Sequence, residues 1–379
     1  MSIQMITAAE VAKRLMNKEK MFILDVRNES DYNDWKIEGE QVTSINVPYF
    51  ELLDGVEGIL DRLPKDEQVL VVCAKEGSSK MVAEMLAEAG MTNVAFLQGG
   101  MKKWSEELYK VNVHEDENSK VYQFIRVGKG CLSYMVISGN EALVVDPSRF
   151  IDVYQQVADE EGVKITHIVD SHLHADHISG GKKLAEQTGA TYYLMKSEGA
   201  VFDFEPLEQH EEITFENVKL QVLAVKTPGH TPGSVSFFVN DQLLFSGDTI
   251  FVGGLGRPDL GGKAREWAND LYDTVYEKVA AIADDVMVLP GHYASLDDEL
   301  NEKGFIGDTL GRIRERNDMM QNKEKEEFVE LVAAQTNNET PPNFEDIVAI
   351  NRGEREATLD EQQELEIGPN RCALYHTHE

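Results

Sequence analysis

The first hundred residues alternate short, almost continuously apolar runs with amphipathic stretches. The runs Met21–Val26, Val69–Val72 and Val94–Leu97 are typical of strands buried in a parallel sheet. Between the last two, Ser78–Ala89 has apolar residues at helical spacing, and Gly90 follows it as a stop signal. This strand–helix–strand order predicts a small α/β domain over residues 1–111.

The pattern changes after residues 112–120, a polar and acidic stretch that we expect to be a linker. Val121–Val127 and Cys131–Val145 are predicted to be antiparallel strands, with a turn at residues 138–140. A helix from Phe150 to about Glu161 and a strand at Lys164–Asp170 should follow, and strands and helices then alternate to about residue 290. Residues 121–304 are therefore expected to form a second, larger domain.

The remaining residues have a different composition. From residue 305 onward the chain is charged and helical in pattern, and it ends in an acidic stretch with few apolar residues. We therefore predict a C-terminal extension, helical and acidic, over residues 305–379.

Length and charge narrow the class of protein. A chain of 379 residues is long enough for about two domains. The net charge of −32 argues against binding to nucleic acid or to an anionic membrane surface, which both need clustered cations. No stretch has the apolar length of a signal peptide or a membrane span, so we expect a cytoplasmic protein without a membrane partner.

Three cysteines, Cys73, Cys131 and Cys372, are too widely spaced for a disulfide framework and are expected to be free thiols. Cys131 lies in the first predicted hairpin of the second domain, where a small buried residue is expected rather than a ligand. Cys372 and the terminal His376 and His378 are expected to lie in an unstructured tail.

Cys73 is the candidate nucleophile of the first domain. It directly follows a predicted strand and precedes a predicted helix, so backbone N–H groups and the helix dipole converge on its thiol. Such a position favours the thiolate and would stabilise a persulfide anion on the cysteine. A buried, inert cysteine is the other interpretation, and position alone leaves both open. The neighbouring residues expected to bind substrate are Lys75, Gly77, Ser78 and Ser79.

Two segments around this loop resemble the rhodanese family. They are ILDVRNESDYNDWKIEGEQVTSINVPYFEL and VLVVCAKEGSSKMVAEMLAEAGMTNVAFLQGGMKKW, and the likeness covers about residues 5–108. Asp25 and Arg27 stand in the aspartate–arginine position of that family. The resemblance implies that this domain moves sulfane sulfur through a persulfide on Cys73. Trp35-Lys36-Ile37 replaces the usual Gly-His-Ile, and Lys75 is the only cation of the loop, so the sulfur acceptor stays open.

A second group of residues predicts a metal site. The segment HLHADH, residues 172–177, packs three imidazoles and a carboxylate into one strand-to-helix turn. Further on, one aspartate and two histidines each follow an apolar run and lie beside glycine. Imidazole and carboxylate suit zinc, iron or manganese, and the absence of a nearby cysteine argues against a soft-metal site. The full set is His172, His174, Asp176, His177, His230, Asp248 and His292.

This set resembles the signature of the metallo-β-lactamase superfamily over about residues 121–293. The resemblance implies an αββα sandwich for the second domain, beside the α/β rhodanese domain. The ligand types fit a dinuclear zinc hydrolase of the glyoxalase II type as well as a mononuclear iron enzyme. The segment TIFVGGLGRPDLGGKAREWANDLYDTVYEKV is similar to the persulfide dioxygenase branch, with Arg257 and Asp259 in its Gly-Arg-x-Asp position. The stretch GFIGDTLGRIRERNDMM, with the later PPNF, resembles the tail of dioxygenases fused to rhodaneses.

The likeness to that branch implies one Fe(II) per chain, held by His172, His230 and Asp248. It leaves His174, Asp176, His177 and His292 as surrounding residues or as ligands of a second metal. Arg257 would steady an anionic thiol carrier or a developing sulfinate-like charge, or would only pair with Asp259. Tyr293 would donate to the substrate or would simply pack.

The implied function is oxidation of a low-molecular-weight thiol persulfide by O₂ and water to the thiol and sulfite. In the first domain, Cys73 would carry out a coupled sulfur transfer, with thiosulfate as its product or its sulfur donor. Two alternatives stay open: a zinc thioester hydrolase with an accessory rhodanese, and a non-enzymatic sulfur carrier or sensor. The sequence leaves the carrier thiol open, and family habit suggests a homodimer or homotetramer.

Overall fold

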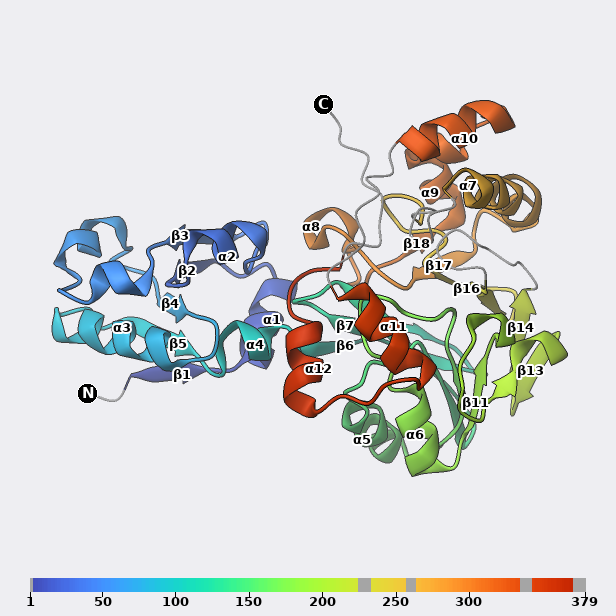
Figure 1. Cartoon of the computed structure of the whole chain (residues 1–379), viewed down its shortest axis with the longest axis horizontal. Coiled ribbons are helices and arrows are strands. Elements are labelled where there is room, and N and C mark those ends of the chain that lie inside the picture. The colour runs from blue at the N-terminus through green and yellow to red at the C-terminus, as the bar shows by residue number, and fades with distance from the viewer. Residues whose placement is uncertain (1–2, 224–232, 257–263, 335–342, 371–379) are drawn as a thin grey trace. The chain divides into compact units, whose positions relative to one another are not determined.

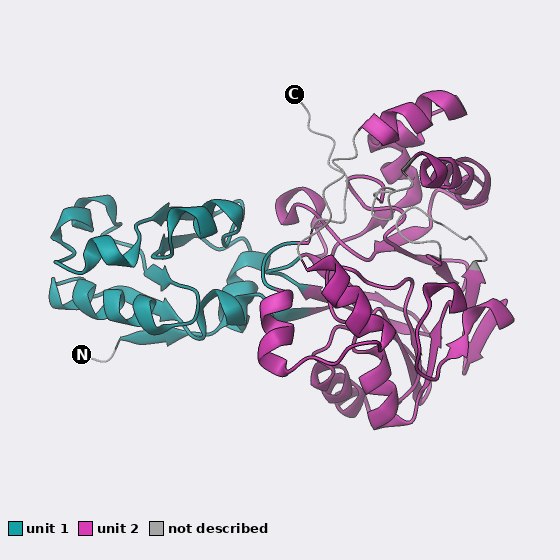
Figure 2. Ribbon diagram, in the orientation of Figure 1, with its two compact units in different colours: residues 1–109, 126–129, 367–369 teal, residues 110–125, 130–366, 370–379 magenta. Residues whose placement is uncertain are grey.

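The computed structural model describes residues 3–223, 233–256, 264–334 and 343–370. The chain divides into two compact units, shown in different colours in Figure 2. Unit 1 consists of residues 1–109, 126–129 and 367–369, and unit 2 of residues 110–125, 130–366 and 370–379.

Unit 1 is an α/β domain built on a five-stranded sheet of order β1-β5-β4-β2-β3, in which every neighbouring pair is parallel. The strands are β1 (Gln4–Ile6), β2 (Met21–Asp25), β3 (Val42–Asn46), β4 (Val69–Val72) and β5 (Val94–Leu97). The helices are α1 (Ala8–Met16), α2 (Glu29–Asp34), α3 (Gly77–Glu88) and α4 (Gly100–Trp104), with 3₁₀ turns η1 (Tyr49–Leu52) and η2 (Glu57–Arg62). The three predicted strands and the predicted helix are confirmed.

The core of unit 1 explains why the apolar runs are continuous. All residues of β2, β4 and β5 are buried, because a central strand of a parallel sheet is covered on both faces. On one face, Val82, Ala83 and Leu86 of α3 pack with Phe22 and Leu24 of β2. This packing fixes the start of α3 against the end of β4, where Cys73 lies.

Unit 2 contains two sheets (Figure 1). The seven-stranded sheet has the order β12-β11-β10-β9-β8-β7-β6 and the six-stranded sheet the order β13-β14-β15-β16-β17-β18. The first is formed by β6 (Leu108–Glu115), β7 (Lys120–Arg126), β8 (Cys131–Ser138), β9 (Glu141–Val145), β10 (Lys164–Val169), β11 (Thr191–Leu194) and β12 (Glu205–Pro206). The second is formed by β13 (Glu212–Phe215), β14 (Val218–Leu223), β15 (Ser236–Val239), β16 (Leu243–Gly247), β17 (Met287–Pro290) and β18 (Asp308–Thr309).

The two sheets pack face to face, with helices outside them. Tyr134 of β8 lies edge-on against Phe245 of β16, with ring centroids 4.9 Å apart, and its hydroxyl donates to the Pro290 carbonyl at 2.6 Å. Helices α5 (Asp152–Glu161) and α6 (Gly181–Thr188) pack on the seven-stranded sheet. The other helical layer contains α7 (Ala264–Asp273), α9 (Leu310–Arg316) and α10 (Lys325–Ala334). The predicted αββα sandwich is therefore correct.

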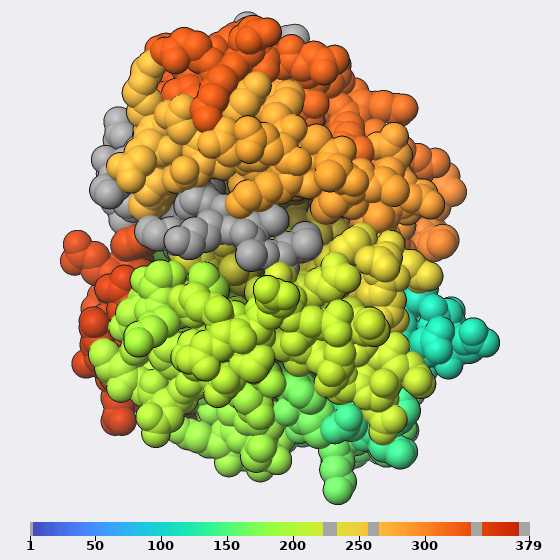
Figure 3. Space-filling model, turned by 90° about the vertical axis from the view of Figure 1, so that its right-hand side faces the viewer, coloured from blue at the N-terminus to red at the C-terminus, as the bar shows by residue number. Residues whose placement is uncertain are grey.

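The outer helical layer of the six-stranded sheet shares one core with it. Ala268, Leu271, Ile313 and Phe328 from these helices are buried in the same cluster as Val288 of β17. In Figure 3 the segments coloured gold to orange, which include this layer, occupy the upper part of the face. The shorter elements of unit 2 are α8 (Leu296–Glu299), α11 (Phe344–Arg352), α12 (Leu359–Leu365), the π-helical turn η5 (Thr274–Lys278) and the 3₁₀ turns η3 (Lys196–Glu198), η4 (Leu207–Gln209), η6 (Val279–Ala281) and η7 (Asp318–Met320).

One expectation about the organisation of the chain is wrong, and one is correct only in part. The proposed linker 112–120 is largely strand: residues up to Glu115 belong to β6 and Lys120 begins β7, with a turn closed by the Asp116 N–H donating to the Ser119 carbonyl. β6 is an edge strand, where polar and charged side chains are common, so its composition resembled that of a linker. The C-terminal extension is helical as expected, with α9 to α12, but it is not separate, since β18 pairs with β17 and residues 305–366 belong to unit 2.

Among the helices of the described residues, none combines the length and the hydropathy that crossing a membrane would require.

Candidate functional site

Cys73 lies between β4 and α3 in unit 1, as the sequence predicts. Its side chain is buried, and its thiol donates to the Ser79 hydroxyl at 3.2 Å. Ser79 in turn donates to the Glu76 carbonyl at 2.9 Å. Ser79 is therefore fully buried behind the cysteine, where it can orient the sulfur, rather than at the surface that a substrate would reach.

A cavity of about 560 Å³ opens beside Cys73. Three of the residues predicted to bind substrate, Lys75, Gly77 and Ser78, line it. The lining residues that sequence reasoning did not single out as substrate contacts are Val26, Arg27, Asn28, Asp31, Tyr49, Phe50 and Ala74. Tyr49 and Phe50 are 41% and 56% exposed, an unusual state for adjacent aromatic side chains that favours contact with a ligand. Because they lie 23 and more residues before Cys73, local sequence around the cysteine does not indicate them.

The cysteine loop is held from behind by the start of α4, where Gly99 caps the helix and Gly100 begins it. The Met101 N–H donates to the Cys73 carbonyl at 2.8 Å, and the Lys102 N–H donates to the Ala74 carbonyl at 3.0 Å. Gly100 has φ +60°, and a Cβ there would lie 2.3 Å from the Cys73 carbonyl oxygen. Only glycine fits this approach. The Gly99-Gly100 pair therefore sets the position of the loop that presents the cysteine.

Asp25 and Arg27 form a buried ion pair beside the cavity. Arg27 Nη2 lies 2.6 Å from Asp25 Oδ2, and the side chains are 6% and 1% exposed. Arg27 Nη2 also donates to the Trp35 carbonyl at 2.6 Å, so the guanidinium ties the end of β2 to the segment after α2. This pair holds one wall of the cavity.

Replacing Arg27 with alanine is expected to destabilise unit 1 by about 3–5 kcal/mol, because Asp25 would keep its charge in a buried place without a cationic partner. Denaturant unfolding followed by probes in unit 1 would measure this free energy. Arg14→Ala is the matched control: Arg14 pairs with Glu10 at the surface, and its loss should cost less than about 1 kcal/mol. An equal, small effect of both replacements would contradict the structural role given to the buried pair.

The predicted metal residues of unit 2 come from three strand ends. Residues 172–177 follow β10, Asp248 follows β16 and His292 follows β17. The six residues of the set that the structure describes are buried to 95% or more: His172, His174, Asp176, His177, Asp248 and His292. His230, Arg257 and Asp259 lie outside the described residues. The structure therefore brings together six side chains that span 120 residues of sequence.

His292 joins the two carboxylates of this cluster. Its Nδ1 lies 2.6 Å from Asp248 Oδ1 and its Nε2 lies 2.9 Å from Asp176 Oδ2. Asp176 Oδ1 is 3.0 Å from His177 Nδ1. On the other side of Asp248, its Oδ2 lies 3.6 Å from His172 Nε2. Burial alone would raise the pKa of the Asp176 carboxyl, but the His292 and His177 imidazoles hold it well below its usual range.

His174 is turned toward a different pair of carboxylates. Its Nε2 lies 3.3 Å from Asp146 Oδ1 and 3.8 Å from Asp170 Oδ1. Burial alone would lower the pKa of His174, yet these two carboxylates raise it well above its usual range. Sequence reasoning missed Asp146 and Asp170, although each directly follows a buried strand, which is the signal that identified Asp248.

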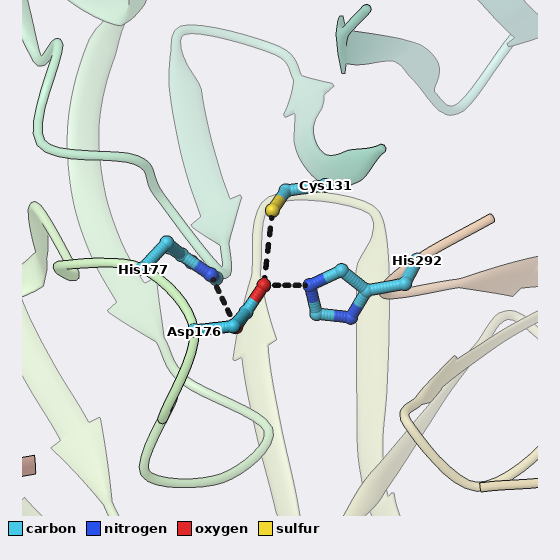
Figure 4. Close-up of side chains that lie close together, drawn as sticks. All are labelled: Cys131, Asp176, His177 and His292. Carbon is cyan, nitrogen blue, oxygen red and sulfur yellow. Dashed lines mark hydrogen bonds and ion pairs between the residues drawn. The ribbon is translucent and has the colours of Figure 1, made fainter. Parts of the chain in front are cut away.

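The expectation that no cysteine lies near the metal residues is wrong, because Cys131 lies beside them. Its thiol donates to Asp176 Oδ2 at 3.3 Å, and Figure 4 shows it beside Asp176, His177 and His292. Cys131 is buried, as expected, but it lies at the metal cluster. The reason is an isolated bridge between Cys131, at the start of β8, and His292, a long-range pairing that the local sequence does not encode. Tyr293, next along the chain, is buried, and its backbone N–H donates to the Gly130 carbonyl.

The residues present fit a metal ion. Two donors bound to one ion at about 2.0–2.2 Å each must lie within about 4.4 Å of each other, so the 3.6 Å between His172 Nε2 and Asp248 Oδ2 is suitable. Imidazole and carboxylate are ligands of zinc and of non-haem iron. The cluster also buries the carboxylates of Asp176 and Asp248, whose charge a bound cation would offset.

The fold and the site define a two-domain protein: an α/β domain presenting a cysteine loop, and a two-sheet sandwich with a buried histidine–aspartate cluster. Comparison with known families agrees. The metallo-beta-lactamase superfamily matches residues 126–294, and the rhodanese-like domain matches residues 7–107. The chain belongs to the metallo-β-lactamase superfamily and carries a rhodanese-like domain ahead of that fold.

Relatives within the superfamily have different activities. The mitochondrial persulfide dioxygenase ETHE1 of Bos taurus is 32% identical over 157 residues, which cover 40% of this chain and 59% of the relative. The chain thus spans less than two thirds of that protein's length. The probable metallo-hydrolase YqgX of Bacillus subtilis is 31% identical over 186 residues, covering 44% of this chain and 86% of the relative.

Two solved structures are similar to this chain over part of its length. A metallo-beta-lactamase from Staphylococcus aureus superimposes with a TM-score of 0.56 and 30% identity, covering 62% of this chain and 73% of that chain. ETHE1 from Myxococcus xanthus superimposes with a TM-score of 0.51 and 26% identity, covering 65% of this chain and 100% of that chain.

Proposed function

We propose that unit 2 is a persulfide dioxygenase that uses one Fe(II) per chain. It converts a low-molecular-weight thiol persulfide, O₂ and water into the thiol, sulfite and two protons. His172, His230 and Asp248 hold the iron, and unit 1 transfers sulfane sulfur through a persulfide on Cys73. The similarity to persulfide dioxygenases supports the reaction class.

The observation that carries the proposal is the double contact of His292. Both of its ring nitrogens are engaged by carboxylates, at 2.6 and 2.9 Å, so it orients Asp248 and Asp176 and offers no third donor. Through its Nδ1, His292 suits a surrounding residue that orients Asp248, the proposed iron ligand. Its Nε2 and Asp176, with His177 and Cys131, could also hold an ion, so the metal content of the loaded protein decides between one ion and two. His174 Nε2 faces Asp146 and Asp170.

When bound, ferrous iron supplies open coordination positions at which a persulfide and dioxygen meet, which removes most of the entropy cost of their encounter. The protein's own residues would bind the ion and exclude water from it. His172 and Asp248, whose donor atoms lie 3.6 Å apart, would hold the ion. The surrounding side chains are almost completely buried, so bulk water is excluded from the cluster and the electrostatic contacts within it are strengthened.

In unit 1, the Cys73 sulfur would attack the outer sulfur of a donor such as thiosulfate, forming the cysteine persulfide and releasing sulfite. A thiol acceptor then takes the outer sulfur and restores the cysteine, with no net oxidation. The cavity beside Cys73 is large enough for a thiol of modest size. Run in the opposite direction, the same steps would join sulfite from unit 2 to sulfane sulfur and give thiosulfate.

The test is oxygen consumption by iron-loaded protein with persulfides of glutathione, bacillithiol and coenzyme A, with sulfite and thiosulfate quantified. We expect about one iron per chain and, with sulfite and thiosulfate counted together, one of these products per O₂ consumed. Zinc-loaded protein is the control and should not consume oxygen. Two zinc ions per chain, thioester cleavage and no oxygen uptake would instead establish the dinuclear hydrolase, which the similarity to a probable metallo-hydrolase keeps as second candidate.

A further inference from the structure

The segment that carries the metal residues runs as an irregular loop between β10 and α6. Without a helix or a strand ladder, its backbone N–H and C=O groups must find other partners when they are buried. Between His174 and Ser179, four of these groups are bonded to just two side chains. Both side chains come from the C-terminal part of the chain, more than 170 residues away.

The first of these side chains is Asn351, in the last turn of α11. Its Nδ2 donates to the His174 carbonyl and to the His177 carbonyl, both at 2.8 Å. Its Oδ1 accepts the Ser179 N–H at 2.9 Å. An amide has two N–H donors and one carbonyl, so this loop uses every kind of group that asparagine offers. The three contacts also fix which way round the amide lies, because a flipped amide would face two carbonyls with its oxygen.

The second side chain is Glu366, the residue after α12, which is completely buried. Its Oε1 accepts the Ile178 N–H at 2.7 Å, and its Oε2 accepts from Arg149 Nε at 2.5 Å. The charge of the carboxylate is therefore compensated by a nearby cation while it holds the loop. Figure 1 draws in red both α11, which carries Asn351, and α12, which Glu366 directly follows.

We propose that Asn351 and Glu366 are positioning residues for the metal centre. They fix the backbone on both sides of Asp176 and His177, and so set the geometry that binds the ion. These two residues of the C-terminal part of the chain are then part of the metal site, although neither is a ligand. The inference rests on the metal centre proposed above, and it concerns binding of the ion rather than the reaction.

Asn351→Asp is the sharpest test, because it keeps the shape and the acceptor for Ser179 but replaces the two donors with an oxygen facing two carbonyls. Titration of the metal-free protein with Co²⁺, in competition with a chelator, should give an affinity at least about tenfold weaker than that of the wild type. Amide hydrogen exchange of a peptide spanning residues 172–180 should also become faster. Glu366→Gln, which removes the charge paired with Arg149, should weaken Co²⁺ binding in the same direction.

Arg352→Ala is the matched control. Arg352 neighbours Asn351 on the same helix, but its Nε donates to the Glu198 carbonyl at 3.0 Å, outside the metal loop. Its loss should lower the thermal midpoint without moving the Co²⁺ affinity by more than about twofold. The proposal is overturned if Asn351→Asp and Glu366→Gln both bind Co²⁺ as the wild type does, or if Arg352→Ala weakens binding as much as they do. A wild-type chain that binds no Co²⁺ would refute the metal centre itself.

Discussion

Replacing His172 with alanine should reduce persulfide-dependent oxygen consumption by at least about 100-fold. Loss of a residue that merely orients a ligand costs about 10–100-fold in metal affinity or activity, and loss of a ligand should exceed that. His172 is buried, with its Nε2 3.6 Å from Asp248 Oδ2, so no neighbouring solvent-exposed group can replace it easily. The measurement is the initial rate of oxygen uptake with glutathione persulfide, together with the iron content of the purified variant.

The control for this prediction is His210→Ala, since His210 is a half-buried histidine of unit 2 that pairs with Glu205 outside the cluster. It should keep the wild-type rate. Sulfur transfer by unit 1 should be unaffected in both variants, because Cys73 belongs to the other compact unit. Unchanged oxygen uptake in His172→Ala would remove the basis for an iron enzyme and would favour a non-enzymatic sulfur carrier built around Cys73.

The parts of the structure that the sequence predicts well are those with a dense local signal. Continuous apolar runs located β2, β4 and β5, because a strand covered on both faces cannot alternate with polar residues. The HLHADH segment identified the metal loop for a similar reason: histidines and an aspartate so close together rarely serve packing alone. In both cases the information lies within fewer than ten residues.

The features that the sequence could not predict depend on contacts between distant residues. Asn351 is an ordinary polar residue in a charged helix until the fold places it 2.8 Å from two carbonyls of the metal loop. Cys131 reaches Asp176 through the bridge between Cys131 and His292, which joins the start of β8 to the residues after β17. No periodicity or spacing in the local sequence encodes either contact. The misassigned linker has another cause, since an edge strand tolerates the polar residues that are also typical of linkers.

Replacing Cys73 with serine should abolish sulfur transfer from thiosulfate to a thiol, with a loss of at least about a thousandfold. A serine oxygen cannot carry sulfane sulfur, and removal of a covalent nucleophile is among the most damaging changes an active site can suffer. The change is small in volume, and Ser79 still offers a hydroxyl to the new side chain, so unit 1 should stay folded. The measurement is the rate of sulfite release from thiosulfate in the presence of glutathione.

The Cys73→Ser variant also tests which unit carries out which reaction. Oxygen consumption with a supplied thiol persulfide should stay within about twofold of wild type, because the metal cluster lies wholly in unit 2. Cys131→Ser is the matched control, since Cys131 is the other buried free cysteine among the described residues and lies at the metal cluster. It should leave sulfur transfer intact. If sulfur transfer survives in Cys73→Ser but fails in Cys131→Ser, the persulfide forms on Cys131 of unit 2. Both sites would then need a different assignment.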